Sequence, residues 1–396
     1  MQGSVTNEQV AELTDQLIAE LPPSSTDPVV FLGAQFDRGL AWIGNAEGEG
    51  GLSASPKLQQ IVNEKVAAAG GPSAWNRNPI GFGMCGPTVA VWGTPEQRQR
   101  YLRPLFTCEE IWCQLFSEPG AGSDFAGLSS RAVRDGDEWV VNGQKVWTTL
   151  AHLSRFGLLV VRTDPEAVKH AGLAAFVVDM HAPGVEVRPL RQMTGEAEFN
   201  EVYFTDVRIP AKEMLGRPGD GWRVSLTTLM NERVSIGGAI PPKGTGPIAE
   251  VLRVWACLPD ERREAVTRDE LMKLWSRAEV LRLTNIRANQ MRKMGDPGPE
   301  GSIAKLAMAE LHKDILEFAV DLTGADGMLY GDYTMSRPER AMASGSLPKM
   351  FLRTRANSIE GGTSEVMRNI LGERVLGLPG DVRVDRDVAW SKVPRN

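Results

Sequence analysis

The hydrophobic pattern changes its period twice along the 396 residues, and this change most constrains the fold. Residues 1–110 carry apolar side chains at helical spacing, as between Val10 and Leu17. Residues 111–220 carry short β-like runs separated by turns, and residues 221–396 return to helical spacing. We therefore predict an α+β protein with an N-terminal helical domain, a middle antiparallel β domain and a C-terminal helical bundle.

Turn signals divide the middle region into strands. Asp135-Gly136 predicts a hairpin, and Asn142-Gly143 predicts a second turn before a strand at 145–149. Long helical patterns do not alternate with these strands, so βαβ units are not expected. Residues 240–268 show no single period and are expected to be irregular. Helices are predicted at Trp222–Ile236, Glu270–Met294, Gly301–Leu322, Leu347–Ser358 and Ser364–Leu371.

Composition excludes several classes of protein. The net charge is -6, with 44 Lys+Arg against 50 Asp+Glu, so the basic face of a nucleic-acid-binding protein is not expected. No apolar run approaches the roughly 18 residues of a membrane span. No Lys or Arg precedes Arg38, which argues against a signal peptide. The 4 cysteines form no CxxC pair, so neither a disulfide framework nor a zinc cluster is expected, and scattered thiols fit the cytoplasm.

Short catalytic motifs indicate a function only when the expected secondary structure surrounds them. Gly81–Gly86 matches GxGxxG, the motif of a nicotinamide dehydrogenase, but no strand precedes it and Pro87 follows it. We interpret it as a glycine-rich loop. The four histidines lie outside metal-ligand spacing, so no metal site is predicted. GxSxG and GKS/GKT motifs do not occur, which leaves serine hydrolase and P-loop chemistry without support.

The stretch from Gln114 to Asp124 contains Pro119, two glycines and Ser123, which predicts a tight turn with exposed N–H groups and a hydroxyl. Such a nest can hold pyrophosphate oxygens, although turn chemistry alone also fits a plain loop. Together with Asn142–Thr149 and Gly362–Asn369, this stretch resembles the acyl-CoA dehydrogenase family. The resemblance covers most of the chain and is weakest over the first 80 residues.

The resemblance implies that FAD lies between the β domain and the C-terminal bundle. The residues that it assigns to the flavin are Gln114, Phe116, Ser117, Gly122, Ser123, Trp147, Thr149, Thr363 and Glu365. The first three would line the isoalloxazine ring, and the next two would reach the pyrophosphate. Trp147 would cover one face of the ring, and Thr149 would lie near N5. Without the resemblance, Trp147 would be interpreted as a core aromatic at a strand end.

The implied reaction is α,β-dehydrogenation of an acyl-CoA thioester, in which a carboxylate removes the α-proton and the β-hydride passes to flavin N5. The family places this base either directly before the Gly-Thr of the C-terminal motif or in a Glu-Arg pair on a helix. Here Gly361 occupies the first position and displaces Glu360 by one residue. We therefore expect Glu232 to be the base, Arg233 to contact substrate and the Gly361 N–H to bind the thioester carbonyl. Glu360 stays open as an alternative, as does a solvated surface pair at 232–233.

The chain departs from the family in elements that contact a neighbouring subunit's flavin. An Arg-x-x-Phe-Gly-like element is missing from 241–268, and Asp321 and Ala325 replace a Gln and a Gly of a second element. The resemblance is then to the catalytic subunits of actinobacterial α2β2 steroid side-chain enzymes, in which a homologous subunit completes the site. It implies a bulky or steroid-derived acyl group and an electron-transfer flavoprotein as acceptor. A non-catalytic partner subunit and an oxidase are the alternatives.

Overall fold

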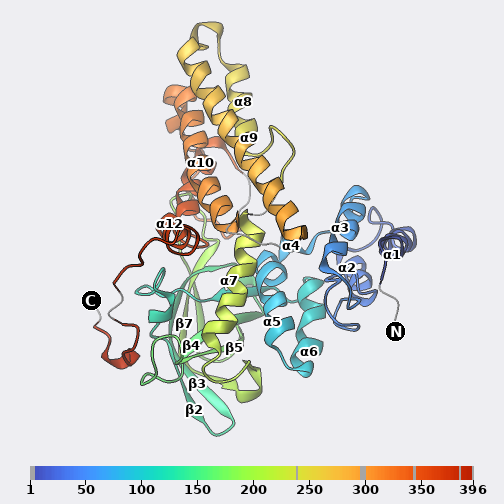
Figure 1. Cartoon of the computed structure of the whole chain (residues 1–396), viewed down its shortest axis with the longest axis vertical. Coiled ribbons are helices and arrows are strands. Elements are labelled where there is room, and N and C mark those ends of the chain that lie inside the picture. Colours follow the sequence, from blue (N-terminus) through green and yellow to red (C-terminus); the bar gives the residue numbers. More distant parts are fainter. Residues whose placement is uncertain (1–4, 238–239, 295–299, 342–344, 383–384, 395–396) are drawn as a thin grey trace.

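The computed structural model describes residues 5–237, 240–294, 300–341, 345–382 and 385–394, except the side chains of 233–237, 292–294 and 300. The chain forms helices first, then a sheet, then a second group of helices (Figure 1). This order confirms the predicted α+β class. The N-terminal helices are α1 (Asn7–Glu20), α2 (Pro28–Asp37), α3 (Gln59–Ala68), α4 (Ala74–Arg77), α5 (Gly86–Trp92) and α6 (Pro95–Phe106).

Local capping explains where α6 begins. The side chain of Thr94 accepts a hydrogen bond from the Gln97 N–H, and the Gln97 side chain accepts one from the Thr94 N–H. Pro95 occupies the first helical position, where its missing N–H costs nothing. Thr94 and Pro95 also predict a helix start from sequence alone, and α6 begins there.

The glycine-rich stretch at 81–86 is helical, so the loop interpretation was wrong. Residues Gly81–Cys85 form one π-helical turn that continues into α5. A Cβ on Gly81 would lie 2.3 Å from the Asn78 side chain, and one on Gly86 would lie 3.0 Å from the Trp42 ring. The glycines therefore serve close packing. The helix α4 precedes this turn where a dinucleotide fold would place a strand.

The sheet has eight strands in the order β6-β7-β3-β2-β4-β5-β8, with β1 paired to β4. The predicted hairpin at Asp135-Gly136 is confirmed, since β2 and β3 pair in antiparallel register. However, β1 runs parallel to β4, so the sheet is mixed and the purely antiparallel expectation was wrong. The long excursion through β2 and β3 gives the chain the crossover that a parallel pair needs. The strands are β1 (Trp112–Leu115), β2 (Arg131–Asp135), β3 (Glu138–Thr149), β4 (Phe156–Arg162), β5 (Leu173–Asp179), β6 (Val185–Pro189), β7 (Phe199–Pro210) and β8 (Met214–Leu215).

Strand β3 runs without interruption through Asn142-Gly143, so the second turn expected there was also wrong. The register against β7 shifts between Val141 and Gly143, which marks a bulge. A Cβ on Gly143 would lie 2.2 Å from the Ser130 Oγ. The glycine thus permits a close approach of two strands.

The second group of helices follows the predicted pattern with one addition. Helix α8 lies within 240–268, where irregular structure was expected, and that expectation was wrong. Pro247 starts α8, and Ile248, Val251 and Val254 bury its apolar face, but flanking Pro and Gly conceal so short a period. The helices are α7 (Gly221–Gly237), α8 (Pro247–Cys257), α9 (Ala265–Met294), α10 (Glu300–Thr323), α11 (Leu347–Thr354) and α12 (Ser364–Ile370).

Helix α7 connects the three parts of the molecule. It packs against β5 of the sheet, α5 of the N-terminal helices and α10 of the C-terminal bundle. One buried cluster, which includes Val89, Phe116 and Val224, joins α7 to the N-terminal helices and the sheet. In Figure 1, α8, α9 and α10 extend away from the sheet, and α1 lies at the far side of the N-terminal helices. Across the described residues, the helices are too short or too polar to cross a membrane.

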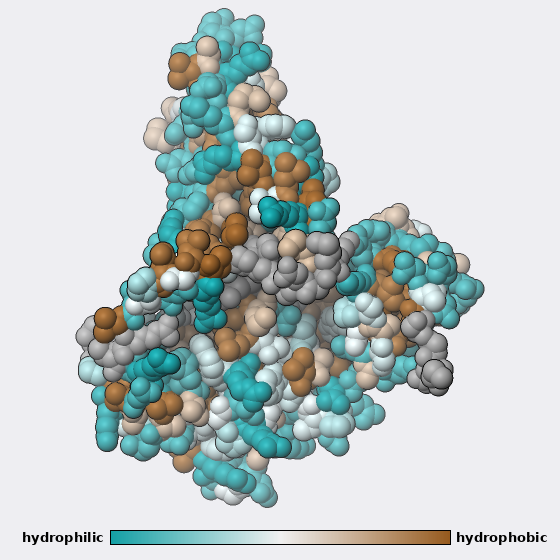
Figure 2. Space-filling model, in the orientation of Figure 1, coloured by the Kyte–Doolittle hydropathy of each residue, from teal (hydrophilic) through white to brown (hydrophobic). Residues whose placement is uncertain are grey.

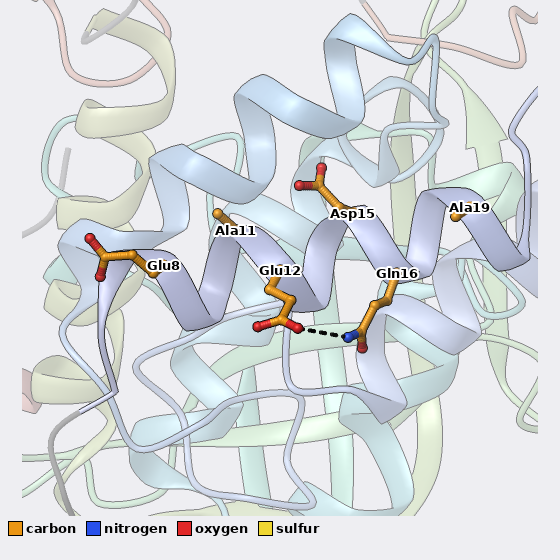
Figure 3. Close-up of a pocket in the computed structure, with 6 residues that line it drawn as sticks. All are labelled: Glu8, Ala11, Glu12, Asp15, Gln16 and Ala19. Atoms are coloured by element: carbon orange, nitrogen blue, oxygen red, sulfur yellow. Dashed lines mark hydrogen bonds between the residues drawn. The ribbon is translucent and has the colours of Figure 1, made fainter.

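A shallow hollow follows one outer face of α1, from Glu8 to Ala19 (Figure 3). Its polar side chains include Glu12 and Gln16, and the Gln16 amide donates to the Glu12 carboxylate at 3.4 Å. All of its lining residues belong to this single helix, which lies far from β3 in Figure 1. The segments that carry the sequence motifs lie instead around β1, β3 and α12.

Candidate functional site at the junction of the sheet and the C-terminal helices

A buried ion pair joins the ends of β1 and β3. The Lys145 Nζ lies 2.9 Å from the Glu118 carboxylate and donates to the Phe116 carbonyl at 2.9 Å. Glu118 also accepts from the N–H groups of Ser129 and Ser130. Burial favours a raised pKa for Glu118, but Lys145 and these donors outweigh it and hold the pKa below its ordinary value. The segment around Phe116 and the strand before Trp147 are therefore fixed relative to each other.

The turn beyond Glu118 is tight and presents its far side to solvent. Glu118 and Ala121 exchange two backbone hydrogen bonds of 3.1 and 3.0 Å across Pro119-Gly120. Gly122 and Ser123 follow and are exposed, and no atom lies within 4 Å of where a Cβ on Gly122 would stand. The loop thus has the open space that a bound anion needs. Gln114 on β1 and Ser117 are half-buried beside it, and Phe116 stacks on Phe125.

Trp147 lies at a bulge near the end of β3. Its φ is +60°, and its side chain is 58% exposed although it is a large aromatic. A left-handed backbone is unfavourable for such a residue and suggests a functional position. The ring packs edge-on against Phe199 at a centroid distance of 5.8 Å. Two residues on, Thr149 is half-buried and pairs with Phe199 in the sheet register.

Gly361 and Gly362 form a turn in left-handed backbone, with φ of +64° and +93°. Such values suit glycine. The buried Lys305 of α10 holds this turn, because its Nζ donates to the Asn357 carbonyl at 2.9 Å and to the Gly362 carbonyl. Burial lowers the pKa of Lys305, while nearby carboxylates, Glu360 and Glu232 first among them, oppose the decrease. Lys305 therefore lies within electrostatic reach of both candidate bases.

Glu360 is engaged in an ion pair. Arg353 of α11 donates two hydrogen bonds to its carboxylate, at 3.2 and 3.0 Å. The same guanidinium lies 3.3 Å from Glu198, whose side chain is only 2% exposed. The Arg353 guanidinium also lies 5.7 Å from the ring of Phe199, the residue that contacts Trp147. Both oxygens of the Glu360 carboxylate are therefore engaged by one guanidinium.

Glu232 lies near the C-terminal end of α7, on the face that packs into the molecule. Val224 and Thr228 are fully buried one helical turn apart, and Glu232 follows Thr228 by one more turn. The Thr228 hydroxyl lies 2.9 Å from the Thr88 hydroxyl of α5, which fixes this face of α7. Glu232 itself is half-buried. The side chain of Arg233 lies outside the described residues.

Two further residues assigned to the flavin, Thr363 and Glu365, have structural roles in α12. The Thr363 hydroxyl accepts from the Val366 N–H at 3.1 Å and caps the helix. Glu365 is exposed and pairs with Arg368 at 3.3 Å. Their contact with the cofactor stays a prediction, as do the other assigned roles.

The structure therefore gathers the assigned residues into two groups. Gln114 to Ser123, Trp147 and Thr149 lie at the ends of β1 and β3. In the second group, Lys305 donates to the carbonyl of Gly362, the neighbour of Gly361, and interacts electrostatically with Glu232. Sequence reasoning missed Lys145, Lys305 and Arg353. A single basic residue in a strand or helix resembles a surface residue, and only the tertiary contacts show that these three side chains are buried or paired.

Comparison with known proteins identifies the family. Three family models match in order: the acyl-CoA dehydrogenase N-terminal domain over residues 9–109, the middle domain over 113–207 and the C-terminal domain over 219–376. The chain belongs to the acyl-CoA dehydrogenase family. The chain is 38% identical to acyl-CoA dehydrogenase IpdE1 of Mycobacterium tuberculosis over 348 residues, which cover 87% of this chain and 86% of that protein.

Solved structures of acyl-CoA dehydrogenases share the fold. The ChsE4-ChsE5 complex from Mycobacterium tuberculosis superposes with a TM-score of 0.71 at 28% identity and covers 96% of this chain and 100% of the matched chain. The Tcur3481-Tcur3483 steroid ACAD gives a TM-score of 0.72 at 26% identity and covers 94% and 97% of the two chains. Acyl-CoA dehydrogenases use FAD, so this chain is a flavoenzyme.

The residues at the sheet end fit a flavin. Trp147 offers an exposed aromatic face, as an isoalloxazine ring requires, and its strained backbone directs the ring away from the core. The open space at Gly120 and Gly122 leaves their backbone N–H groups accessible to phosphate oxygens. Ser117 and Ser123 add hydroxyl donors beside them.

Proposed function

We propose that this acyl-CoA dehydrogenase is a catalytic subunit in which Glu232 removes the α-proton of the acyl group. The observation that carries the proposal is the position of Lys305, which holds the Gly362 carbonyl and interacts electrostatically with Glu232. This interaction supports a common site for the helix-borne carboxylate and the Gly361-Gly362 turn. Glu360 reaches that site too, but its two hydrogen bonds from Arg353 occupy its carboxylate.

The chemistry needs a base and an oxyanion donor on this chain. Removal of the α-proton places negative charge on the thioester carbonyl, and a backbone N–H aimed at that oxygen stabilises it. The Gly361 N–H provides this donor in our proposal, and Glu232 accepts the proton and holds it. FAD supplies the acceptor for the β-hydride. The half-buried position of Glu232 on α7 keeps the carboxylate in a site from which acyl chains exclude water.

We propose a bulky, steroid-derived acyl group as the substrate class. A glycine at 361 leaves the space that a glutamate side chain would fill in the other placement of the base. One structural neighbour, the Tcur3481-Tcur3483 steroid ACAD, supports this class. Comparing flavin reduction by butyryl-CoA, octanoyl-CoA and a CoA thioester of a steroid side chain tests it. Faster reduction by a straight-chain thioester would reject the steroid class.

Exchange of the two glutamates tests the base. Glu232→Gln and Glu360→Gln variants would be purified with matched FAD content, and flavin bleaching by acyl-CoA would be followed without oxygen. We expect Glu232→Gln to slow bleaching by about 10²-fold to 10⁴-fold, the usual value of a general base, and Glu360→Gln to stay within about tenfold of wild type. The reverse order would assign the base to Glu360. Reoxidation of the reduced enzyme in air separates a dehydrogenase from an oxidase.

We further propose a heteromeric assembly with a homologous subunit. The departures at Asp321 and Ala325 remove residues that a homo-oligomer would give to a neighbouring flavin. Large hydrophobic side chains are exposed on the C-terminal helices and after them, which favours a protein contact there. Figure 2 shows hydrophobic surface over the region of α12. The exposed residues include Met328, Leu329, Ile359, Leu376 and Leu378.

The flavin content of the chain expressed alone tests the assembly. An incomplete site would give a weakly coloured protein, and co-expression with a homologous subunit would restore about one FAD per pair. One FAD per chain without a partner would favour a homo-oligomer. An electron-transfer flavoprotein is the acceptor that we propose, and its reduction by the assembled enzyme is the corresponding assay.

A further inference from the structure

The segment at residues 385–391 lies against the β domain, close to the loop that carries Gly122 and Ser123. The Trp390 N–H donates to the Ala167 carbonyl and the Ser391 N–H to the Pro165 carbonyl, both at 2.9 Å. In Figure 1, the last part of the chain descends from α12 to the side of the sheet. The segment therefore has a defined backbone path beyond residue 376, where the match to the C-terminal family model ends.

The Trp390 side chain supports the far end of that loop. Its Nε1 donates to the Gly127 carbonyl at 3.3 Å. The Arg162 guanidinium lies 4.2 Å from the indole ring and donates to the carbonyls on either side of Gly127, those of Ala126 at 2.6 Å and Leu128 at 3.3 Å. Three successive carbonyls are thus held by one indole and one guanidinium, and Arg162 is only 2% exposed.

Lys169 supports the near end of the loop. Its Nζ lies 2.7 Å from the Asp124 carboxylate and 2.5 Å from the Asp385 carboxylate. Asp124 directly follows Ser123 in the sequence. Lys169 is 9% exposed and the Asp385 side chain is 27% exposed, so the pair is partly shielded from water. Residue 385 is therefore tied through one lysine to the residue next to Ser123.

We propose that residues 385–391 form a strap that holds the loop at 121–128 in the conformation that binds the FAD pyrophosphate. The inference rests on the proposed placement of the pyrophosphate at Gly122 and Ser123. The N–H groups of an anion-binding nest must point to one place. The exposed glycine in this loop increases the conformational entropy that the backbone loses when the loop becomes ordered. A loop already fixed from both ends avoids the cost of ordering when the cofactor binds.

The dissociation constant of FAD tests the strap. Asp385→Asn removes the charge that pairs with Lys169, and Trp390→Phe keeps a ring over Arg162 but removes the donor to Gly127. FAD would be titrated into the stripped full-length chain, together with its partner subunit if it has one, and flavin fluorescence would be followed. We expect each variant to weaken FAD binding by about fivefold to tenfold, as for loss of one polar contact to a fixed loop.

The matched control for Asp385→Asn is Asp387→Asn, an equal charge change at an exposed position two residues away. It should leave FAD affinity within twofold of wild type and the melting temperature of the FAD-free protein unchanged. FAD affinity within twofold of wild type in both Asp385→Asn and Trp390→Phe would overturn the strap. Equal weakening by Asp387→Asn would overturn it as well.

Two variants of the loop separate the strap from the placement of the pyrophosphate. Gly122→Val fills space that no protein atom occupies, and Ser123→Ala removes a hydroxyl. If these variants weaken FAD binding while the strap variants do not, only the strap fails. If the loop variants also leave FAD binding unchanged, the pyrophosphate lies elsewhere and the strap fails with that placement. Neither result depends on which glutamate is the base.

Discussion

Arg353 donates two hydrogen bonds to Glu360 and lies 3.3 Å from Glu198, so one guanidinium serves two carboxylates from different parts of the fold. Glu198 immediately precedes β7 of the sheet, and Glu360 immediately precedes the Gly361-Gly362 turn. The pair therefore links the sheet end that carries Trp147 to the turn that faces the substrate in our proposal. It also engages both oxygens of the Glu360 carboxylate, which supports our proposal that Glu232 is the base.

Loss of Arg353 should be costly to stability. Arg353→Met leaves the carboxylate of Glu198, which is 2% exposed, without its cation, and breaking such a buried pair costs about 3–5 kcal/mol. Urea unfolding followed by circular dichroism measures this change. Arg355→Met is the matched control, because the partner of Arg355, Glu317, is 58% exposed and the pair is worth at most about 1 kcal/mol. Equal effects of the two substitutions would contradict the bridging role of Arg353.

Substitution of Lys305 should lower turnover more than it lowers the affinity for FAD. Lys305→Met removes the donors to Gly362 and Asn357 and a positive charge near Glu232. We expect turnover to fall by about 10²-fold through misplacement of the turn. Because the lysine charge favours the ionised carboxylate, the acidic limb of the pH profile should move to higher pH.

The pH profile is the decisive readout for Lys305, because a merely structural lysine would not move it. Lys313→Met, on the same helix, is the control: its partner Glu310 lies at 2.8 Å on a partly exposed face. That variant should keep the wild-type pH profile. An unchanged profile in Lys305→Met, with turnover reduced, would restrict Lys305 to a structural role.

Periodicity and turn chemistry predicted much of the fold, because each depends on neighbouring residues. The change from helices to strands and back, the hairpin at Asp135-Gly136 and the start of α6 are all local signals. Two of the errors arose where glycine serves packing. Gly81 and Gly143 were interpreted as loop and turn residues, but each permits a close approach to another side chain. Gly81 approaches Asn78, about one helical turn away, and Gly143 approaches Ser130, which is distant in the sequence. A sequence does not show which neighbour a glycine will meet.

The residues of the candidate site could be predicted only where they belong to a recognisable sequence motif. The motif around Ser123 and the displacement of Glu360 by Gly361 were visible in the sequence. Lys145, Lys305 and Arg353 were not, because their partners lie far away along the chain. Burial turns these ordinary basic residues into supports of the site, and burial is a tertiary property.

The ion pair between Lys145 and Glu118 should dominate the stability of the sheet end. Lys145→Met leaves Glu118 buried and unpaired, which costs about 3–5 kcal/mol in the free energy of unfolding. The double variant Lys145→Met with Glu118→Gln should recover part of that loss, since no buried charge is left. Lys57→Met, at an exposed position, is the control and should stay within about 0.5 kcal/mol of wild type.

The same pair predicts a dependence on pH. The pKa of Glu118 is lower in the folded protein than its ordinary value of 4.5, so its stabilising contribution is present above that value and is lost as the pH falls below it. The loss should vanish in the double variant. Below pH 4.5, the unfolding free energy of the wild type should decline more steeply than that of the double variant. Equal slopes would contradict this assignment.

His312 of α10 should make the protein less stable in mild acid. Burial lowers its pKa to about 4 from an ordinary value of 6.5. Between these values the unfolded chain binds the proton and the folded chain does not, so the free energy of unfolding falls as the pH drops from 6.5 to about 4. The loss amounts to at most about 3 kcal/mol. His312→Gln should abolish this part of the decline, whereas His181→Gln, at an exposed position, should keep it. Urea unfolding at pH 7.0, 5.5 and 4.5 measures the difference, and parallel declines in the wild type and His312→Gln would show that other groups cause the acid sensitivity.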